Sequence, residues 1–220
     1  MRAKRTLPKQ DAMLISRYEP DSPISEAYRS IRTSLKFASL DKNHKVCVFT
    51  SAIAGEGKSS IVSNLGILTA QDQNRVLIID GDLRRPHLHH IFRLSNRSGL
   101  STVLSGYDAV ANAVLATDIP NLSILPAGPV KPNPAELLGS SRLEHILHEC
   151  GELFDFVFID TPPLLPVADG KILCRWADGI VFIVRSQFTK KEQIKKAQQV
   201  LEPHKDKMIG VIMNDRSEGS

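Results

Sequence analysis

The sequence is poor in cysteine, in aromatic residues and in long apolar runs. Its 220 residues include three cysteines, Cys47, Cys150 and Cys174, and only 5% of the residues are aromatic. Three widely separated cysteines do not suit a disulfide framework or a zinc site, so we expect reduced core thiols in a cytosolic protein. The longest apolar runs, such as GIVFIV and VLII, fall far short of the roughly 20 residues that cross a bilayer. This shortage predicts no membrane-spanning segment.

Charge is also modest. The net charge is +4, with 24% charged and 42% hydrophobic residues, which is ordinary for one soluble globular domain. Much of the positive excess lies in the first ten residues, MRAKRTLPKQ, which contain no acid. A solvated arm is the simpler interpretation of this stretch, and weak attraction to anionic lipid is the alternative. We divide the chain into a basic N-terminal arm (1–21), one domain (22–214) and a short C-terminal tail (215–220).

Short β-branched apolar runs alternate with longer amphipathic segments, which is typical of parallel strands joined by crossover helices. Strands are predicted at Val46–Thr50, Val76–Asp80, Leu122–Leu125, Phe156–Asp160, Ile180–Val184 and Ile209–Met213. Helices are predicted at Ser25–Ser39, Lys58–Gln71, Ala135–Cys150 and Lys190–Leu201, with Ser25 as the N-cap of the first. The strands are almost continuously hydrophobic, as a sheet covered on both faces requires. The sequence therefore predicts an α/β fold with a mostly parallel central sheet and helices on both faces.

The stretch SAIAGEGKSS, residues 51–60, resembles a phosphate-binding loop with Ala52 in place of its first glycine. It follows a predicted strand and leads into a predicted helix, so loop and helix N–H groups can converge on an anion. The residues expected to bind ATP are Ala54, Gly55, Glu56, Gly57, Lys58, Ser59 and Ser60. Lys58 would reach the β- and γ-phosphates, and the Ser59 hydroxyl would ligate Mg²⁺.

Acidic residues follow two other predicted strands. Asp80 and Asp82 lie in VLIIDGDLRRP, and Asp160 ends FVFID. Ligands of open α/β sheets lie outside the carboxyl ends of the strands, so these acids should face the same loop. Asp82 and Asp160, together with Ser59, suit the oxygen ligands of Mg²⁺. Any single Asp here could instead be a turn cap.

Three histidines, His87, His89 and His90, follow in RRPHLHHIF. Their spacing suggests a metal site, but no carboxylate or cysteine partner lies nearby. We therefore favour the start of a surface helix.

Three motifs together resemble one family: AIAGEGKSS, VLIIDGDLRRP and FVFIDTPPLLPVAD. They look like the Walker A, A-prime and B motifs of the bacterial tyrosine kinases of polysaccharide assembly, within the P-loop ATPases that include ParA and MinD. The resemblance runs from about Ser22 to Asn214. It implies a P-loop NTPase fold and an ATP-dependent, Mg²⁺-dependent protein-tyrosine autokinase that regulates exopolysaccharide or capsule assembly and export. Ala52 is no obstacle, because the family often lacks that glycine.

For such a kinase we assign catalytic roles to Lys58, Asp80, Asp82 and Arg84. Asp80, with Asp82 sharing the role, would position the tyrosine hydroxyl and accept its proton late, while Lys58 and Arg84 or Arg85 stabilise the transferring group. Asn214 is similar to the residue that meets adenine in this superfamily, and a strand-end turn residue is the alternative. Pro132–Leu138 and Asp169 resemble segments that line or support the site.

The segment SEAYRSIR contains Glu26, Arg29 and Arg32 at a spacing that places them on one helical stripe. It resembles the oligomerisation motif of these kinases, and an ordinary solvated face is the alternative. The resemblance implies a ring-like homo-oligomer with no nucleic-acid partner. It also implies a membrane-embedded chain-length regulator that activates the kinase and holds it, as a cytoplasmic protein, at the inner face of the cell membrane.

Two rival functions are a MinD- or ParA-like positioning ATPase and a non-catalytic nucleotide-binding subunit. Ile53 stands where the positioning ATPases carry a signature lysine, which argues against the first. The acceptor tyrosine stays open, because the only tyrosines, Tyr18, Tyr28 and Tyr107, do not form the cluster that the family resemblance implies. Tyr18 is one candidate, and a tyrosine of another protein is the alternative.

Overall fold

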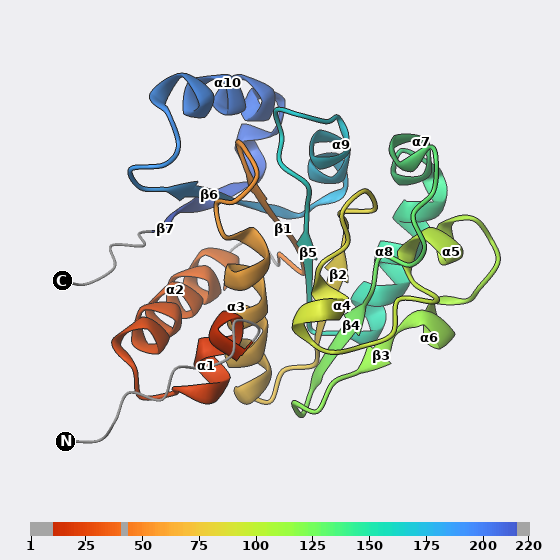
Figure 1. Cartoon of the computed structure of the whole chain (residues 1–220), viewed down its shortest axis with the longest axis horizontal. Coiled ribbons are helices and arrows are strands. Elements are labelled where there is room, and N and C mark those ends of the chain that lie inside the picture. Colours follow the sequence, from red (N-terminus) through yellow and green to blue (C-terminus); the bar gives the residue numbers. More distant parts are fainter. Residues whose placement is uncertain (1–10, 41–43, 215–220) are drawn as a thin grey trace.

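The computed structural model describes residues 11–40 and 44–214. The four basic residues of the first ten and the predicted tail (215–220) lie outside these ranges. Within them, a seven-stranded sheet has the order β3-β4-β2-β5-β1-β6-β7, and only β3 is antiparallel to its neighbour (Figure 1). The strands are β1 (Val46–Ser51), β2 (Val76–Asp80), β3 (Leu115–Ala116), β4 (Leu122–Leu125), β5 (Phe156–Asp160), β6 (Gly179–Arg185) and β7 (Met208–Asn214).

Helices cover both faces of the sheet. The larger helices are α2 (Pro23–Leu40), α3 (Lys58–Gln71), α8 (Ser141–Leu153), α9 (Asp169–Trp176) and α10 (Lys191–Leu201). The shorter ones are η1 (Asp11–Leu14), α1 (Ile15–Tyr18), α4 (Leu88–Ile91), α5 (Leu100–Leu104), α6 (Val110–Ala113), α7 (Pro134–Leu138) and η2 (Glu202–Lys207). One buried apolar cluster lies under α2 and α3, and a second lies under α8, α9 and α10. The α/β fold with two covered faces is confirmed.

All six predicted strands are present, each within one residue of its predicted ends. Two helix predictions were wrong in detail. The segment predicted as one helix, Ala135–Cys150, is divided into α7 and α8 at Gly139 and Ser140, and the Ser140 hydroxyl donates to the carbonyl of Leu137 (2.7 Å). Ser25 is not the N-cap of α2, because the Ser22 hydroxyl accepts the Ser25 N–H (3.2 Å).

Part of the predicted N-terminal arm is packed on the domain. Leu14 is buried in the core. The buried amide of Asn64 in α3 accepts the Ser16 N–H (2.8 Å) and donates to the Met13 carbonyl (2.7 Å). Residues 13–16 are thereby fixed against α3, nearly two helical turns beyond its start. No helix in the described ranges is both long and apolar enough to cross a membrane.

The three cysteines are free and buried, as predicted for core thiols. Burial raises the pKa of each of Cys47, Cys150 and Cys174 to about 12, so all three stay protonated at neutral pH.

Candidate active site

The carboxyl ends of β1, β5 and β2 lie side by side in the sheet, and the predicted site residues follow them. β5 pairs with both neighbours, and Asp80 of β2 is the register partner of Asp160 of β5. The loop after β1 leads into α3, which begins at Lys58. The sheet order therefore places the phosphate-binding loop and the acidic strand ends together.

Two glycines give the loop its shape. Gly55 and Gly57 have φ angles of 83° and 92°, in the left-handed region that disfavours other residues. A Cβ on Gly57 would also fall 2.3 Å from the side-chain nitrogen of Asn214. Ala52 is fully buried, and it has no positive φ, which explains why this position does not need glycine.

Lys58 is the buried cation of the site. Its side chain is 8% exposed, and its ammonium donates to the Ser51 hydroxyl (2.9 Å). Burial lowers the pKa of Lys58, and the negative charges of Asp160, Glu56 and Asp82 oppose this effect. The Lys58 ammonium is thus held close to the charges of three carboxylates, at the start of α3.

Asp160 and Ser59 form the core of the predicted metal site. The Ser59 hydroxyl donates to one carboxylate oxygen of Asp160 (2.5 Å). The other oxygen, Oδ1, is buried and has no hydrogen-bond partner among the described residues. Burial raises the pKa of Asp160 to about 6, against the opposing effect of Lys58. A buried carboxylate oxygen without a donor, beside a hydroxyl, fits the oxygen ligands that Mg²⁺ takes.

Asp80 organises the loop that follows β2. It is 1% exposed and accepts the N–H groups of Asp82 (3.2 Å), His87 (2.9 Å) and Leu88 (3.0 Å). Burial raises its pKa to about 7, and the charge of Asp160 adds to this rise. Asp82 is only half-buried and accepts the N–H of Arg85 (2.9 Å). Asp82 is therefore the more accessible carboxylate, and Asp80 fixes its position.

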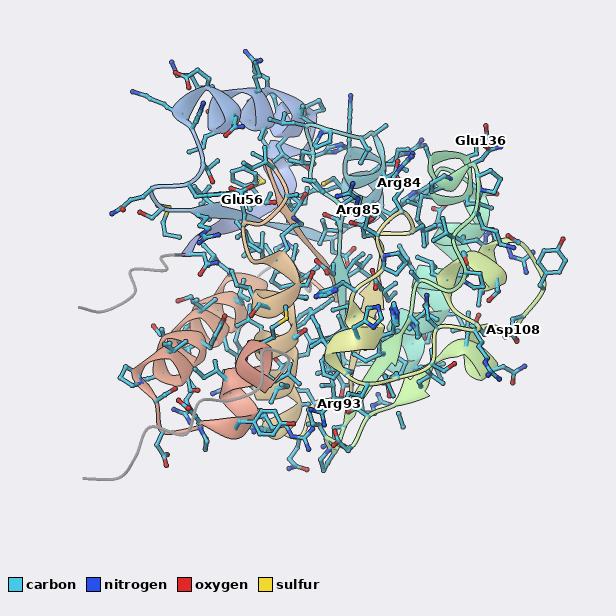
Figure 2. All side chains as sticks on the ribbon, in the orientation of Figure 1. Glu56, Arg84, Arg85, Arg93, Asp108 and Glu136 are labelled. Atoms are coloured by element: carbon cyan, nitrogen blue, oxygen red, sulfur yellow. The ribbon has the colours of Figure 1, made fainter. Side chains whose placement is uncertain are left out.

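The structure pairs Arg84 with Asp169. The Arg84 guanidinium makes two hydrogen bonds (2.7 and 3.0 Å) to this carboxylate, whose side chain has no exposure. Glu56 lies beside β6, whereas Arg84 and Arg85 lie near α9 (Figure 2). The pair joins the loop after β2 to the start of α9, so Arg84 is engaged away from the phosphate-binding loop. Its predicted catalytic role stays a prediction.

Replacing Arg84 with Ala should lower the free energy of unfolding by about 2 kcal/mol, because it leaves the buried Asp169 carboxylate unpaired. Arg84 is partly exposed, which keeps the loss below that of a fully buried pair. Urea unfolding followed by circular dichroism measures the change, with Arg85→Ala as the matched control. Equal stability of the two variants would contradict the assigned pairing.

The Glu56 carboxylate holds the phosphate-binding loop in place through hydrogen bonds. It is fully buried and accepts the Ile53 N–H (2.7 Å) and the Thr189 hydroxyl. Its carbonyl accepts the Asn214 side-chain amide (2.9 Å). Glu56 and Asn214 thus tie the loop to β6 and β7, and the predicted contact of Asn214 with adenine stays a prediction. Thr189 was not predicted, since nothing local in the sequence marks it.

Residues of the predicted oligomerisation stripe have partners within the chain. Arg29 pairs with Glu26 (2.7 Å), and Arg32 reaches Asp72 (2.9 Å) and the Leu68 carbonyl (2.9 Å) on α3. Arg32 therefore helps to hold α2 on α3 within one copy. The role of the stripe in assembly stays a prediction.

The histidine-rich stretch begins a helix, as predicted, with His87 preceding α4. Within residues 11–40 and 44–214, no group of three or more His, Cys, Asp or Glu side chains is arranged to hold a metal ion.

The raised pKa values of Asp80 and Asp160 predict that the metal-free protein loses stability as pH rises. A carboxyl group whose pKa is higher in the folded state binds protons more tightly there, so its contribution is complete near pH 4. It is lost by pH 7, and the loss is at most about 4 kcal/mol for Asp80. His87, His89 and His204 have lowered pKa values and act in the opposite sense.

The difference between wild type and Asp80→Asn isolates the carboxyl group. Urea unfolding in EDTA at pH 5 and pH 8 should show a larger decrease for the wild type. A difference between the two proteins that does not change with pH would contradict the prediction.

A glycine loop between β1 and α3, a buried lysine and acids on two adjacent strands define a P-loop ATPase. Residues 44–208 match the model of the AAA domain family. The chain is 44% identical over 203 residues to tyrosine-protein kinase YwqD of Bacillus subtilis, covering 92% of this chain and 86% of that protein. The chain belongs to the bacterial tyrosine kinases, as the sequence motifs predicted, and it is a protein-tyrosine kinase.

Two solved structures place the fold among its relatives. The kinase domain of the Escherichia coli tyrosine kinase ETK matches with a TM-score of 0.88 at 29% identity, covering 100% of this chain and 86% of that one. The cell division ATPase MinD of Pyrococcus furiosus matches with a TM-score of 0.69 at 22% identity, covering 80% and 74%. The second likeness concerns the fold alone.

Proposed function

We propose that this kinase uses MgATP to phosphorylate tyrosine on copies of itself, and thereby regulates the assembly and export of a capsular or exopolysaccharide. The observation that carries the chemistry is the convergence of Lys58 and Ser59 with Asp80, Asp82 and Asp160 at one edge of the sheet. Loop N–H groups between Gly55 and Ser60 would bind the phosphates of ATP at the start of α3.

Ser59, Asp82 and Asp160 would hold Mg²⁺, which neutralises phosphate charge when bound. The buried Oδ1 of Asp160 without a donor supports this assignment. Lys58 stabilises negative charge on the transferring phosphoryl group. It is already buried, so little solvent has to be displaced when that charge develops.

The Asp80 and Asp82 pair positions the tyrosine hydroxyl and accepts its proton late. Prior removal of the proton from a phenol, with a pKa near ~10, by an ordinary carboxylate would cost about 8 kcal/mol. The pKa of Asp80, raised to about 7, reduces that cost to about 4 kcal/mol. A loose transition state makes full prior transfer unnecessary.

A partner and an assembly complete the proposal. We propose that a membrane-embedded chain-length regulator activates the kinase at the inner face of the membrane. Copies of the chain would assemble into a ring, with Glu26, Arg29 and Arg32 forming contacts between neighbouring copies. The support is the motif of α2 and its presence in a chain similar to bacterial tyrosine kinases.

The test is mass spectrometry of the purified chain after incubation with MgATP. It should be run with and without the cytosolic segment of a candidate membrane regulator. We expect phosphotyrosine that increases with the segment and is missing from Lys58→Met. ATP hydrolysis stimulated by lipid or DNA, without phosphotyrosine on either protein, would instead favour a positioning ATPase.

A further inference from the structure

The three tyrosines of the chain differ in how far they reach into solvent. Tyr107 is 81% exposed, whereas Tyr18 is 37% exposed. Tyr28 is half-buried and lines the cleft beside the phosphate-binding loop. A phenol must project from its own surface to reach the buried Lys58 and Asp80 of another copy. Of the three tyrosines, Tyr107 meets this requirement best.

Tyr107 lies in a tight turn that follows α5. Gly106 has a φ of 81°, and the Tyr107 N–H donates to the Thr102 carbonyl (3.0 Å). On the other side, the Asp108 carboxylate accepts the Ser98 hydroxyl, and this hydrogen bond lowers the pKa of Asp108. The backbone before and after Tyr107 is therefore fixed, while its side chain extends into solvent.

Two cations lie beside Tyr107. The Lys131 ammonium is 5.3 Å from the centre of the Tyr107 ring. The Arg142 guanidinium lies against Gly106, since a Cβ on this glycine would fall 3.2 Å from Nη1 of Arg142. Neither Lys131 nor Arg142 forms an ion pair with another residue in the described part of the chain. The surroundings of Tyr107 thus favour a negative group at this position.

We propose that Tyr107 is a phosphorylation site of this kinase, modified by a second copy, and that Lys131 and Arg142 bind the resulting phosphate. The inference rests on the phosphorylation between copies proposed above and names its acceptor. Asp108, which follows Tyr107, lies at the edge of the molecule and away from Glu56 of the phosphate-binding loop (Figure 2). Transfer to Tyr107 therefore requires the active site of another copy.

The transfer converts a neutral phenol into a charged group. The phenol oxygen of Tyr107 forms a bond to the γ-phosphorus of ATP, and the bond from that phosphorus to the β–γ bridging oxygen breaks, which releases ADP. The phenol proton passes to Asp80 or Asp82 of the copy that holds ATP, and from there to water. The product carries a charge of about −2, and Lys131 and Arg142 can form charge-assisted hydrogen bonds with its oxygens. The phosphate would then join the turn after α5 to the start of α8.

Phosphopeptide mass spectrometry of the full chain after incubation with MgATP tests the site, with a synthetic Glu–Tyr copolymer as a second acceptor. The variant is Tyr107→Phe, and Tyr18→Phe is the matched control. We expect Tyr107→Phe to lower phosphotyrosine on the chain at least about fivefold and Tyr18→Phe less than about twofold, because the acceptor must reach the transferring group. Phosphorylation of the copolymer should be unchanged in both variants.

A mixture of two variants tests transfer between copies. Isotope-labelled Lys58→Met provides an acceptor without activity, and unlabelled Tyr107→Phe provides the active enzyme. Phosphate should appear on Tyr107 of the labelled chain. An unmodified Tyr107 beside phosphorylated Tyr18 or Tyr28 would overturn the inference and leave phosphorylation between copies standing. Phosphotyrosine on the copolymer alone would refute that phosphorylation as well, and none on either acceptor would refute the proposed reaction itself.

The role of the cations is measured by adding a phosphatase to the phosphorylated chain. We expect phosphate to leave Tyr107 at least about threefold faster in Arg142→Gln than in the wild type, because one charge-assisted partner is lost. Lys195→Gln, which changes an exposed lysine of α10, should match the wild type. Equal rates in Arg142→Gln and the wild type would overturn the assigned binding of the phosphate by Arg142.

Discussion

Lys58→Met should lower the rate of phosphoryl transfer by at least about a thousandfold. Removal of one neutral hydrogen-bond donor from a preorganised, water-poor active site lowers the rate about 10²–10³-fold. Lys58 is a full cation, so we expect its loss to have a larger effect. It is also the buried cation that the charges of Asp160, Glu56 and Asp82 face. The substitution therefore removes both the attraction for phosphate and the balance of charge within the site.

Quantitative phosphotyrosine formation at saturating MgATP measures this effect. Lys195→Met, an exposed lysine of α10, is the matched control and should keep wild-type activity. Thermal unfolding must show that the Lys58 variant is folded. Folded protein with more than a tenth of wild-type activity would remove Lys58 from the proposed mechanism.

The second large effect is expected for Asp80→Asn, which should lower kcat by roughly 10²–10³-fold while ATP affinity changes less than about threefold. The amide is the same size as the carboxyl group, but its nitrogen cannot accept a hydrogen bond. The N–H groups of Asp82, His87 and Leu88 therefore lose part of their acceptor. The accessible Asp82 carboxylate would then be less well placed for the hydroxyl and its proton.

Steady-state kinetics with a peptide or protein acceptor, alongside direct ATP binding, separate the two quantities. Asp206→Asn, an exposed residue after α10, is the matched control. An Asp80 variant that loses ATP affinity as much as turnover would show that Asp80 belongs to nucleotide binding. Normal turnover would refute its role in transfer.

Much of the site could be predicted because a parallel sheet places its strand ends together. Asp80 and Asp160 are 80 residues apart in sequence, yet each ends a hydrophobic strand, and the strands are neighbours. The motif around Lys58 carries its own local geometry, since Gly55 and Gly57 adopt the left-handed backbone that only glycine favours. Periodicity and loop chemistry thus predicted which residues meet.

Side-chain partners across the fold could not be predicted in the same way. Arg84 lies in a motif that suggests phosphate contact, but its guanidinium reaches Asp169 at the start of α9. Arg32 lies on a stripe that suggests assembly, but it binds Asp72 of α3. Such pairs depend on the distance between elements far apart in sequence, which hydrophobic pattern does not specify. Division of one predicted helix at Gly139 has a similar tertiary component, because the Trp176 indole donates to the Leu138 carbonyl (3.1 Å).

The buried Glu56 bears on how this enzyme could become resistant to inhibitors. Its carboxylate connects the phosphate-binding loop to Thr189, immediately before α10, so substitutions that shift α10 can alter ATP affinity without touching ATP. Selection against an ATP-competitive inhibitor would therefore be expected to yield changes around α10 as well as in the pocket.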